Sequence, residues 1–346
     1  MPHSSTAPNH SRYYLTAPTQ SQLEAYHARR RPAVADPLEK TSVLAWQGPN
    51  LYPRTTPPSE YPDQRLPSPS PHPPRPLLTS LLSPSSPSHD GPGWSLRLID
   101  PVQQGTDKWS QVWRCRVVHP RGGANAGDRK ETVLLKLRHE ALFPEPMDFD
   151  SSPEHESWNW WPAEHLVERE AACYSRFQAV QGRDVPLCYG FYRFDLPSGE
   201  TAVGVVLEDL SETTIELSTY IEREVAGRRL SHDLTQALAD SAFALQYRLQ
   251  SLHILGTCTR LSDLLLVRSS LPSSSHSSSS SSSSSENDND HPLLIATSFG
   301  STRTLTLALN NRAAAGTEEG GGEGRERWRM RDQRQLQSAF ERAVRP

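Results

Sequence analysis

The chain has 346 residues with a net charge of −4, and 35% of them are apolar. A length of this kind can hold two domains, but so low an apolar fraction predicts that only part of the chain packs into a core. The nearly balanced charge gives no indication of a nucleic-acid or anionic-membrane partner, and neither is expected.

No part of the sequence resembles a targeting or membrane segment. Apolar runs stay below the roughly 18 residues of a membrane span, and Met1 to Ser5 lack the basic and apolar regions of a signal peptide. Four cysteines are dispersed without a CxxC pair, so neither a disulfide framework nor a zinc site is expected. The sequence therefore predicts an intracellular protein, cytoplasmic or nuclear.

Residues 1–93 are predicted to form a disordered arm rich in Pro and Ser, because 19 of the 30 prolines lie at or before Pro92. The run from Pro67 to Pro76 excludes a central strand and favours polyproline II. It has two interpretations, a ligand for SH3- or WW-type partner proteins and a plain linker, of which the linker is the commoner. A short helix between Tyr13 and Arg31 is the regular element expected here.

Order is predicted to begin near Trp94. Apolar patterns indicate three strands, one helix of about 15 residues and two further strands. The strands are expected at 96–100, 111–118, 132–137, 187–194 and 202–207, and the helix at 163–177. This order is typical of an α+β lobe, residues 94–209, with a five-stranded antiparallel sheet and one helix.

Two residues of this lobe stand at positions that are costly for a charge. Lys136 interrupts the apolar strand 132–137, and Glu170 lies on the apolar stripe of the helix with Leu166 and Cys173. A buried carboxylate is unfavourable unless a cation meets it. The sequence therefore predicts an ion pair between Lys136 and Glu170.

Residues 210–346 are predicted to form a mainly helical second half. Helices are expected at 214–226, from an N-cap at Asp233 to about His253, and at 326–344. Short apolar strands at 264–267 and 293–296 flank a serine tract. Residues 269–291 are interpreted as a disordered insertion in a hairpin. Such an insertion is tolerated because the entropy cost of closing a loop increases only slowly with loop length.

The element order and the Lys136–Glu170 pair resemble the protein-kinase-like superfamily, most closely its shorter members such as the kinase-like proteins of fungi. The resemblance covers about residues 94–303 and implies a two-lobed fold, with 94–209 as the N-lobe and 210–346 as a short C-lobe. It implies that Lys136 and Glu170 position ATP, the cofactor of the family.

The same resemblance implies further nucleotide-binding residues. Gly105 and Val112 occupy the first glycine and the valine of the glycine-rich loop, and Glu208 lies in the segment that resembles the hinge beside adenine. Asp107 and Ser110 replace the other two loop glycines. Loop glycines let backbone amides approach phosphate oxygens. These replacements therefore make the loop a weaker indication of nucleotide binding.

The second half departs from the family pattern at its catalytic positions. Leu261 stands at the place of the catalytic aspartate, which leaves Asp263 as the one carboxylate available as a base, in a displaced position. Ser298 replaces the metal-binding aspartate of the DFG segment, and a hydroxyl is a poor Mg²⁺ ligand beside a carboxylate. No metal-binding residue is therefore predicted, and Mg²⁺ binding is in doubt.

Three functions are compatible with this pattern. The leading hypothesis is a catalytically impaired pseudokinase with a binding or scaffolding role. The first alternative is an active, atypical ATP-dependent phosphotransferase that uses Asp263, with a non-standard catalytic loop or a misplaced exon boundary near residues 257–263. The second alternative is a non-enzymatic interaction protein that binds protein partners through its Pro-rich arm.

Overall fold

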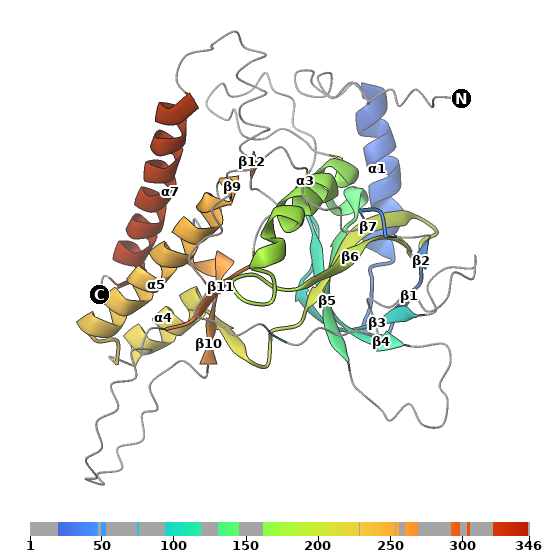
Figure 1. Cartoon of the computed structure of the whole chain (residues 1–346). Helices are drawn as coiled ribbons and strands as arrows, with labels where there is room; N and C mark the ends of the chain where they lie inside the picture. The colour runs from blue at the N-terminus through green and yellow to red at the C-terminus, as the bar shows by residue number, and fades with distance from the viewer. Residues whose placement is uncertain are drawn as a thin grey trace.

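A seven-stranded antiparallel sheet and a mainly helical half make up the protein (Figure 1). The computed structural model describes residues 20–47, 50–52, 75, 94–118, 131–144, 162–227, 229–252, 254–255, 260–268, 292–297, 303–304 and 321–344. Helix α3 (Ala163–Arg176) packs against strands β5, β6 and β7 of the sheet and faces the helical half. This content of helix and sheet agrees with the expected α+β class.

The sheet has the strand order β1-β3-β4-β5-β7-β6-β2. Its five central members are the strands that the sequence predicts, and alternate side chains of β4 are buried as the pattern requires. The five are β3 (Ser95–Gln103), β4 (Gln111–Val118), β5 (Thr132–Arg138), β6 (Cys188–Asp195) and β7 (Thr201–Glu208). The predicted number of five strands in the sheet is wrong, because β1 (Val43–Leu44) and β2 (Trp46–Gln47) add one strand at each edge of the sheet.

The N-terminal segment is more ordered than its composition predicts. Residues 20–35 form helix α1 (Gln20–Ala35), the blue helix beside the sheet in Figure 1. Tyr26, Leu44 and Trp46 are buried. The disorder predicted for residues 1–93 is therefore wrong for 20–47, because a few long-range contacts outweigh a composition that gives no local pattern. Of the run from Pro67 to Pro76 the structure describes Arg75 alone, so the predicted polyproline II lies outside the described residues.

Hydrophobic clusters cover both faces of the sheet. Leu135 and Leu137 of β5 enter one cluster, together with residues of β1, β3 and β4. Leu134 and Val205 belong to the other, which joins α3 to the helical half. Because successive side chains of a strand alternate between faces, Lys136 points to the face that α3 covers.

In the part of the helical half that the structure describes, helices pack together with small sheets. Helix α4 (Leu217–Ala226), α5 (His232–Ser251) and α7 (Gly321–Val344) lie together on the left of Figure 1. The short strands are β8 (Thr214–Glu216), β9 (Ile254–Leu255), β10 (Leu264–Val267), β11 (Leu294–Ala296) and β12 (Arg303–Thr304). Single 3₁₀ turns are η2 (Glu140–Leu142), η4 (Phe177–Ala179) and η5 (Leu261–Asp263).

The predicted hairpin is confirmed by the antiparallel pairing of β10 with β11, in which Leu266 lies opposite Leu294. Two local predictions for this half are wrong. The first three residues expected in a helix at 214–226 form β8, because they pair with β10. Ser231, not Asp233, is the N-cap of α5, and its hydroxyl accepts from the Leu234 N–H at 3.1 Å. The insertion at 269–291 lies outside the described residues.

Cys115, Cys173 and Cys188 are buried and free of disulfides, as is usual for cysteines that serve as small apolar side chains. Among the residues that the structure describes, no helix is both long enough and apolar enough to cross a bilayer.

Candidate functional site

An ion pair joins the sheet to the helix that covers it. Lys136 Nζ on β5 lies 2.8 Å from Glu170 Oε1 on α3, and the Glu170 side chain is fully buried. The predicted pair is therefore confirmed as a contact. Its role in holding a nucleotide stays a prediction.

A second cation, which sequence reasoning missed, shares the same carboxylate. Arg138 Nη2 lies 3.0 Å from Glu170 Oε2, and Arg138 Nη1 donates to the carbonyl oxygen of Trp109 at 2.6 Å. Arg138 is 3% exposed. The signal was available in the sequence, because residues two apart on a strand share a face and Arg138 follows Lys136 by two.

The charges of this cluster depend on one another. Burial opposes the charge on Glu170, but Lys136 and Arg138 outweigh it and hold the pKa of Glu170 below its ordinary value. Burial lowers the pKa of Lys136, while the charge of Glu170 opposes that change. When all three side chains are ionised, two cations face one carboxylate, and the negative charge of Asp263 offsets part of the remaining positive charge.

Asp263 approaches this cluster from the helical half. It ends η5 directly before β10, and the Thr297 N–H donates to its carbonyl oxygen at 2.9 Å. Its carboxylate accepts from the Arg260 N–H at 3.3 Å, and its negative charge acts on Lys136. Burial lowers the pKa of Lys136 and the charge of Asp263 opposes that change, while the catalytic role of Asp263 stays a prediction.

Val112 and Lys136 lie opposite one another in the pairing of β4 with β5, so their side chains share one face of the sheet. Val205 of β7 lies on the other side of Lys136 in the same row. The predicted valine is therefore a direct neighbour of the predicted lysine.

The loop that begins at Gly105 is held by its own chain. The Gly105 N–H donates to Gln111 Oε1 at 3.1 Å, and Gln111 Nε2 donates to the Gly105 carbonyl at 2.6 Å. Gly105 has φ +113 and Asp107 has φ +61, and a left-handed backbone of this kind favours glycine. The Asp107 carboxylate lies 2.9 Å from Arg30 Nη2 of α1.

Glu208 ends β7, and its carboxylate is engaged away from the Lys136 cluster. It accepts from Arg75 Nε at 2.7 Å and from the Leu187 N–H at 3.0 Å. The Glu208 N–H itself donates to the Leu187 carbonyl at 2.9 Å. Sequence reasoning missed Arg75, because its partners lie more than 100 residues further along the chain.

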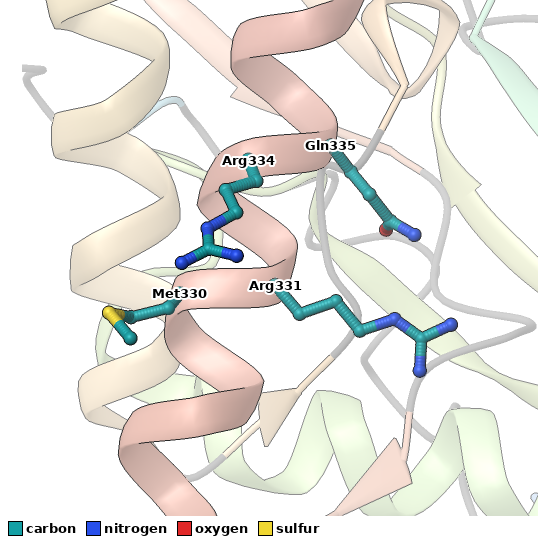
Figure 2. Close-up of a pocket in the computed structure, with 4 residues that line it drawn as sticks. All are labelled: Met330, Arg331, Arg334 and Gln335. Carbon is teal, nitrogen blue, oxygen red and sulfur yellow. The ribbon is translucent and has the colours of Figure 1, made fainter.

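A shallow depression on α7 is a separate surface feature, and none of the predicted site residues lines it. Figure 2 shows its four lining side chains, with Met330 and Arg334 on one side of the helix and Arg331 and Gln335 on the other. All four residues belong to α7. The two members of each pair are four residues apart, which places them on the same face of the helix.

Neither a protein-family model nor a curated protein matches the chain. Among solved structures, the chain is similar to one titled "WaaP in complex with acyl carrier protein". The two share 12% sequence identity, with 70% of this chain and 80% of that chain covered and a TM-score of 0.36. A likeness this remote supports no statement about activity.

Proposed function

We propose that this chain is a protein-kinase-like domain with impaired phosphoryl transfer, a pseudokinase that acts by binding or scaffolding. The support for the kinase-like part is the Lys136–Glu170 pair, which joins a central strand of an antiparallel sheet to the helix between that sheet and a helical half. In kinases such a pair positions the nucleotide phosphates.

The observation that carries impairment is the state of the loop at Gly105. A phosphate-binding loop needs N–H groups that point at the anion and are free to donate. Here the Gly105 N–H already donates to Gln111, and Asp107 adds a carboxylate where negative charge would gather. The chain itself therefore occupies the group that a phosphate would use.

The residues at the expected catalytic positions also indicate impaired phosphoryl transfer. Phosphoryl transfer requires about 8 kcal/mol or more of barrier lowering, most of it from positioned charge and metal ions. By resemblance, Leu261 and Ser298 stand where the base and a metal-binding aspartate belong. The purified full chain should therefore transfer no phosphate from ATP·Mg²⁺ beyond the level of its Lys136→Met variant. Transfer that this substitution abolishes would overturn the proposal.

A second candidate, an active and atypical phosphotransferase, is favoured by one observation. Asp263 ends η5 directly before β10 in the helical half, and its negative charge opposes the lowering of the Lys136 pKa by burial. In the same assay, turnover that Asp263→Asn removes would support this candidate. Sequencing of the transcript across residues 257–263 would show whether a more usual catalytic loop is encoded.

A third candidate is a non-enzymatic interaction protein that uses the Pro-rich arm. A melting experiment with millimolar ATP, with and without Mg²⁺, separates it from the nucleotide-binding candidates. A shift supports nucleotide binding, whereas no shift in either condition favours the interaction protein.

A further inference from the structure

Arg75 fills a site made by the loop before β6 and by the end of β7. Its Nε and Nη2 lie 2.7 and 3.0 Å from the two oxygens of Glu208, so guanidinium and carboxylate form a forked pair. Its Nη1 donates to the Arg183 carbonyl at 3.0 Å, and Nη2 also donates to the Val185 carbonyl at 3.0 Å. The Arg75 main-chain N–H donates to the Gly182 carbonyl at 2.9 Å.

Contacts that do not involve Arg75 hold this site in shape. The Leu187 N–H orients the Glu208 carboxylate at 3.0 Å. Gly182, at φ +73, donates its N–H to the Val185 carbonyl at 2.9 Å. Asp184 is fully buried and pairs with Arg248 of α5 at 3.0 Å. The acceptors are therefore preorganised by the turn that presents them.

The acceptors match an arginine and no other side chain. One carboxylate and two carbonyl oxygens lie around the plane of a guanidinium and engage Nε, Nη1 and Nη2 together. A lysine ammonium is a single point of charge and cannot span these acceptors. The pair is also well shielded, since Arg75 is 21% and Glu208 13% exposed.

The sequence around Arg75 adds a main-chain requirement. Arg75 precedes Pro76 and follows Pro74, and a residue before proline is biased to an extended backbone. It is also the one Lys or Arg in the run from Pro67 to Pro76. The donation from its N–H to Gly182 shows that the site contacts the main chain as well as the side chain.

We propose that Gly182, Arg183, Val185 and Glu208 form a binding site for an arginine in an extended, proline-flanked peptide. Arg75 fills this site within its own chain, and a peptide of the same chemistry takes its place when Arg75 is removed. The site shares Glu208 with the nucleotide-binding residues that the resemblance implies, but it uses neither Lys136 nor Glu170, so peptide binding can be measured in the absence of nucleotide.

The test uses the full chain with Arg75→Ala and a fluorescent peptide of residues 70–80, followed by fluorescence anisotropy. The peptide is expected to bind this variant saturably and to bind the unchanged chain about tenfold or more weakly, because a tethered Arg75 competes at high effective concentration. A peptide with alanine at position 75 should not bind. Adding Glu208→Gln to the variant should weaken binding about tenfold or more.

A matched control is Glu212→Gln in the same variant, since Glu212 is 81% exposed and contacts Arg114 instead. It should leave peptide binding unchanged. If Arg75→Ala prevents folding, Arg75→Lys keeps the charge without the fork and should still expose the site. Equal binding of the arginine and alanine peptides, or no peptide binding to either folded variant, would overturn the proposal.

Discussion

Arg138 and Glu170 lie 3.0 Å apart, so the carboxylate that Lys136 contacts has a second cation on its other oxygen. The three side chains form a branched ionic cluster in which Glu170 is the shared member. Removing Glu170 leaves both cations without an anion, whereas removing Lys136 leaves Glu170 paired with Arg138, so the two changes should differ in their effect on stability.

Glu170→Gln is expected to destabilise the protein more than Lys136→Met. The glutamine leaves two buried cations without their anion, at a cost of about 3–5 kcal/mol. Lys136→Met leaves Glu170 with Arg138 and should cost only about 1–2 kcal/mol. Urea unfolding of both variants measures the two costs. Glu168→Gln, an exposed change on the same helix, is the control and should be nearly neutral. Equal costs for Glu170→Gln and Lys136→Met would show that Arg138 does not compensate.

The pH dependence of stability should depend on Glu170. Its pKa is held below the ordinary 4.5, so below that pH the unfolded chain binds more protons than the folded one. The stability that this residue contributes is present above 4.5 and is lost as the pH falls through the folded pKa. The unfolding free energy of the unchanged chain should therefore fall more steeply in acid than that of Glu170→Gln. Parallel curves would contradict the assignment.

Asp209 also loses stabilising charge as the pH falls into the acid range, but this loss is the same in the unchanged chain and in Glu170→Gln. Although burial opposes its charge, hydrogen bonds from Ser211 and Arg114 hold its pKa below its ordinary value. Both proteins keep these contacts, so the difference between the two curves reports Glu170.

Leu44→Ala should show that the N-terminal segment belongs to the fold. Leu44 is fully buried in the cluster beneath β3 and β4, so the cavity left by the substitution should cost about 2–5 kcal/mol. Val43, its neighbour on β1, is 50% exposed, and Val43→Ala is the matched control with an expected cost below about 1 kcal/mol. Urea unfolding measures both, and similar small effects would mean that β1 does not hold the sheet.

Gln111→Ala combined with Asp107→Gly should increase the response to nucleotide. The first change frees the Gly105 N–H, and the second removes a carboxylate from the loop. The melting temperature of the double variant should rise with ATP by more than that of the unchanged chain. Gln104→Ala is the control, because Gln104 bonds the Leu38 carbonyl and not Gly105. An unaltered response would mean that the loop does not limit phosphate binding.

The elements that the sequence predicts are those with a local pattern. Strand β4 alternates buried and half-buried residues along its length, and Lys136 and Glu170 each break an apolar pattern in a way that only a partner explains. For these, local periodicity and the cost of a buried charge together were sufficient.

The short helix expected between Tyr13 and Arg31 overlaps α1, but the contacts that hold it were missed, because they join residues far apart in the chain. The Tyr26 hydroxyl of α1 donates to the Phe143 carbonyl at 2.6 Å, and Arg30 donates to the same oxygen at 2.8 Å. Arg75 likewise bonds carbonyls of residues 183 and 185. Main-chain acceptors look alike in every sequence, so no local pattern marks these contacts in advance.

The pairing of β10 with β11 bears on how this chain can change during evolution. Leu264 pairs with Ala296 and Leu266 with Leu294, and these contacts fix both ends of the connection between them. Doubling such a connection costs only about 0.6 kcal/mol in closure entropy. A change in the length of the serine run at 277–285 is therefore expected to cost the fold little. Asp263 and Thr297 flank the paired strands β10 and β11, so a change in the length of the serine run should leave their positions unchanged.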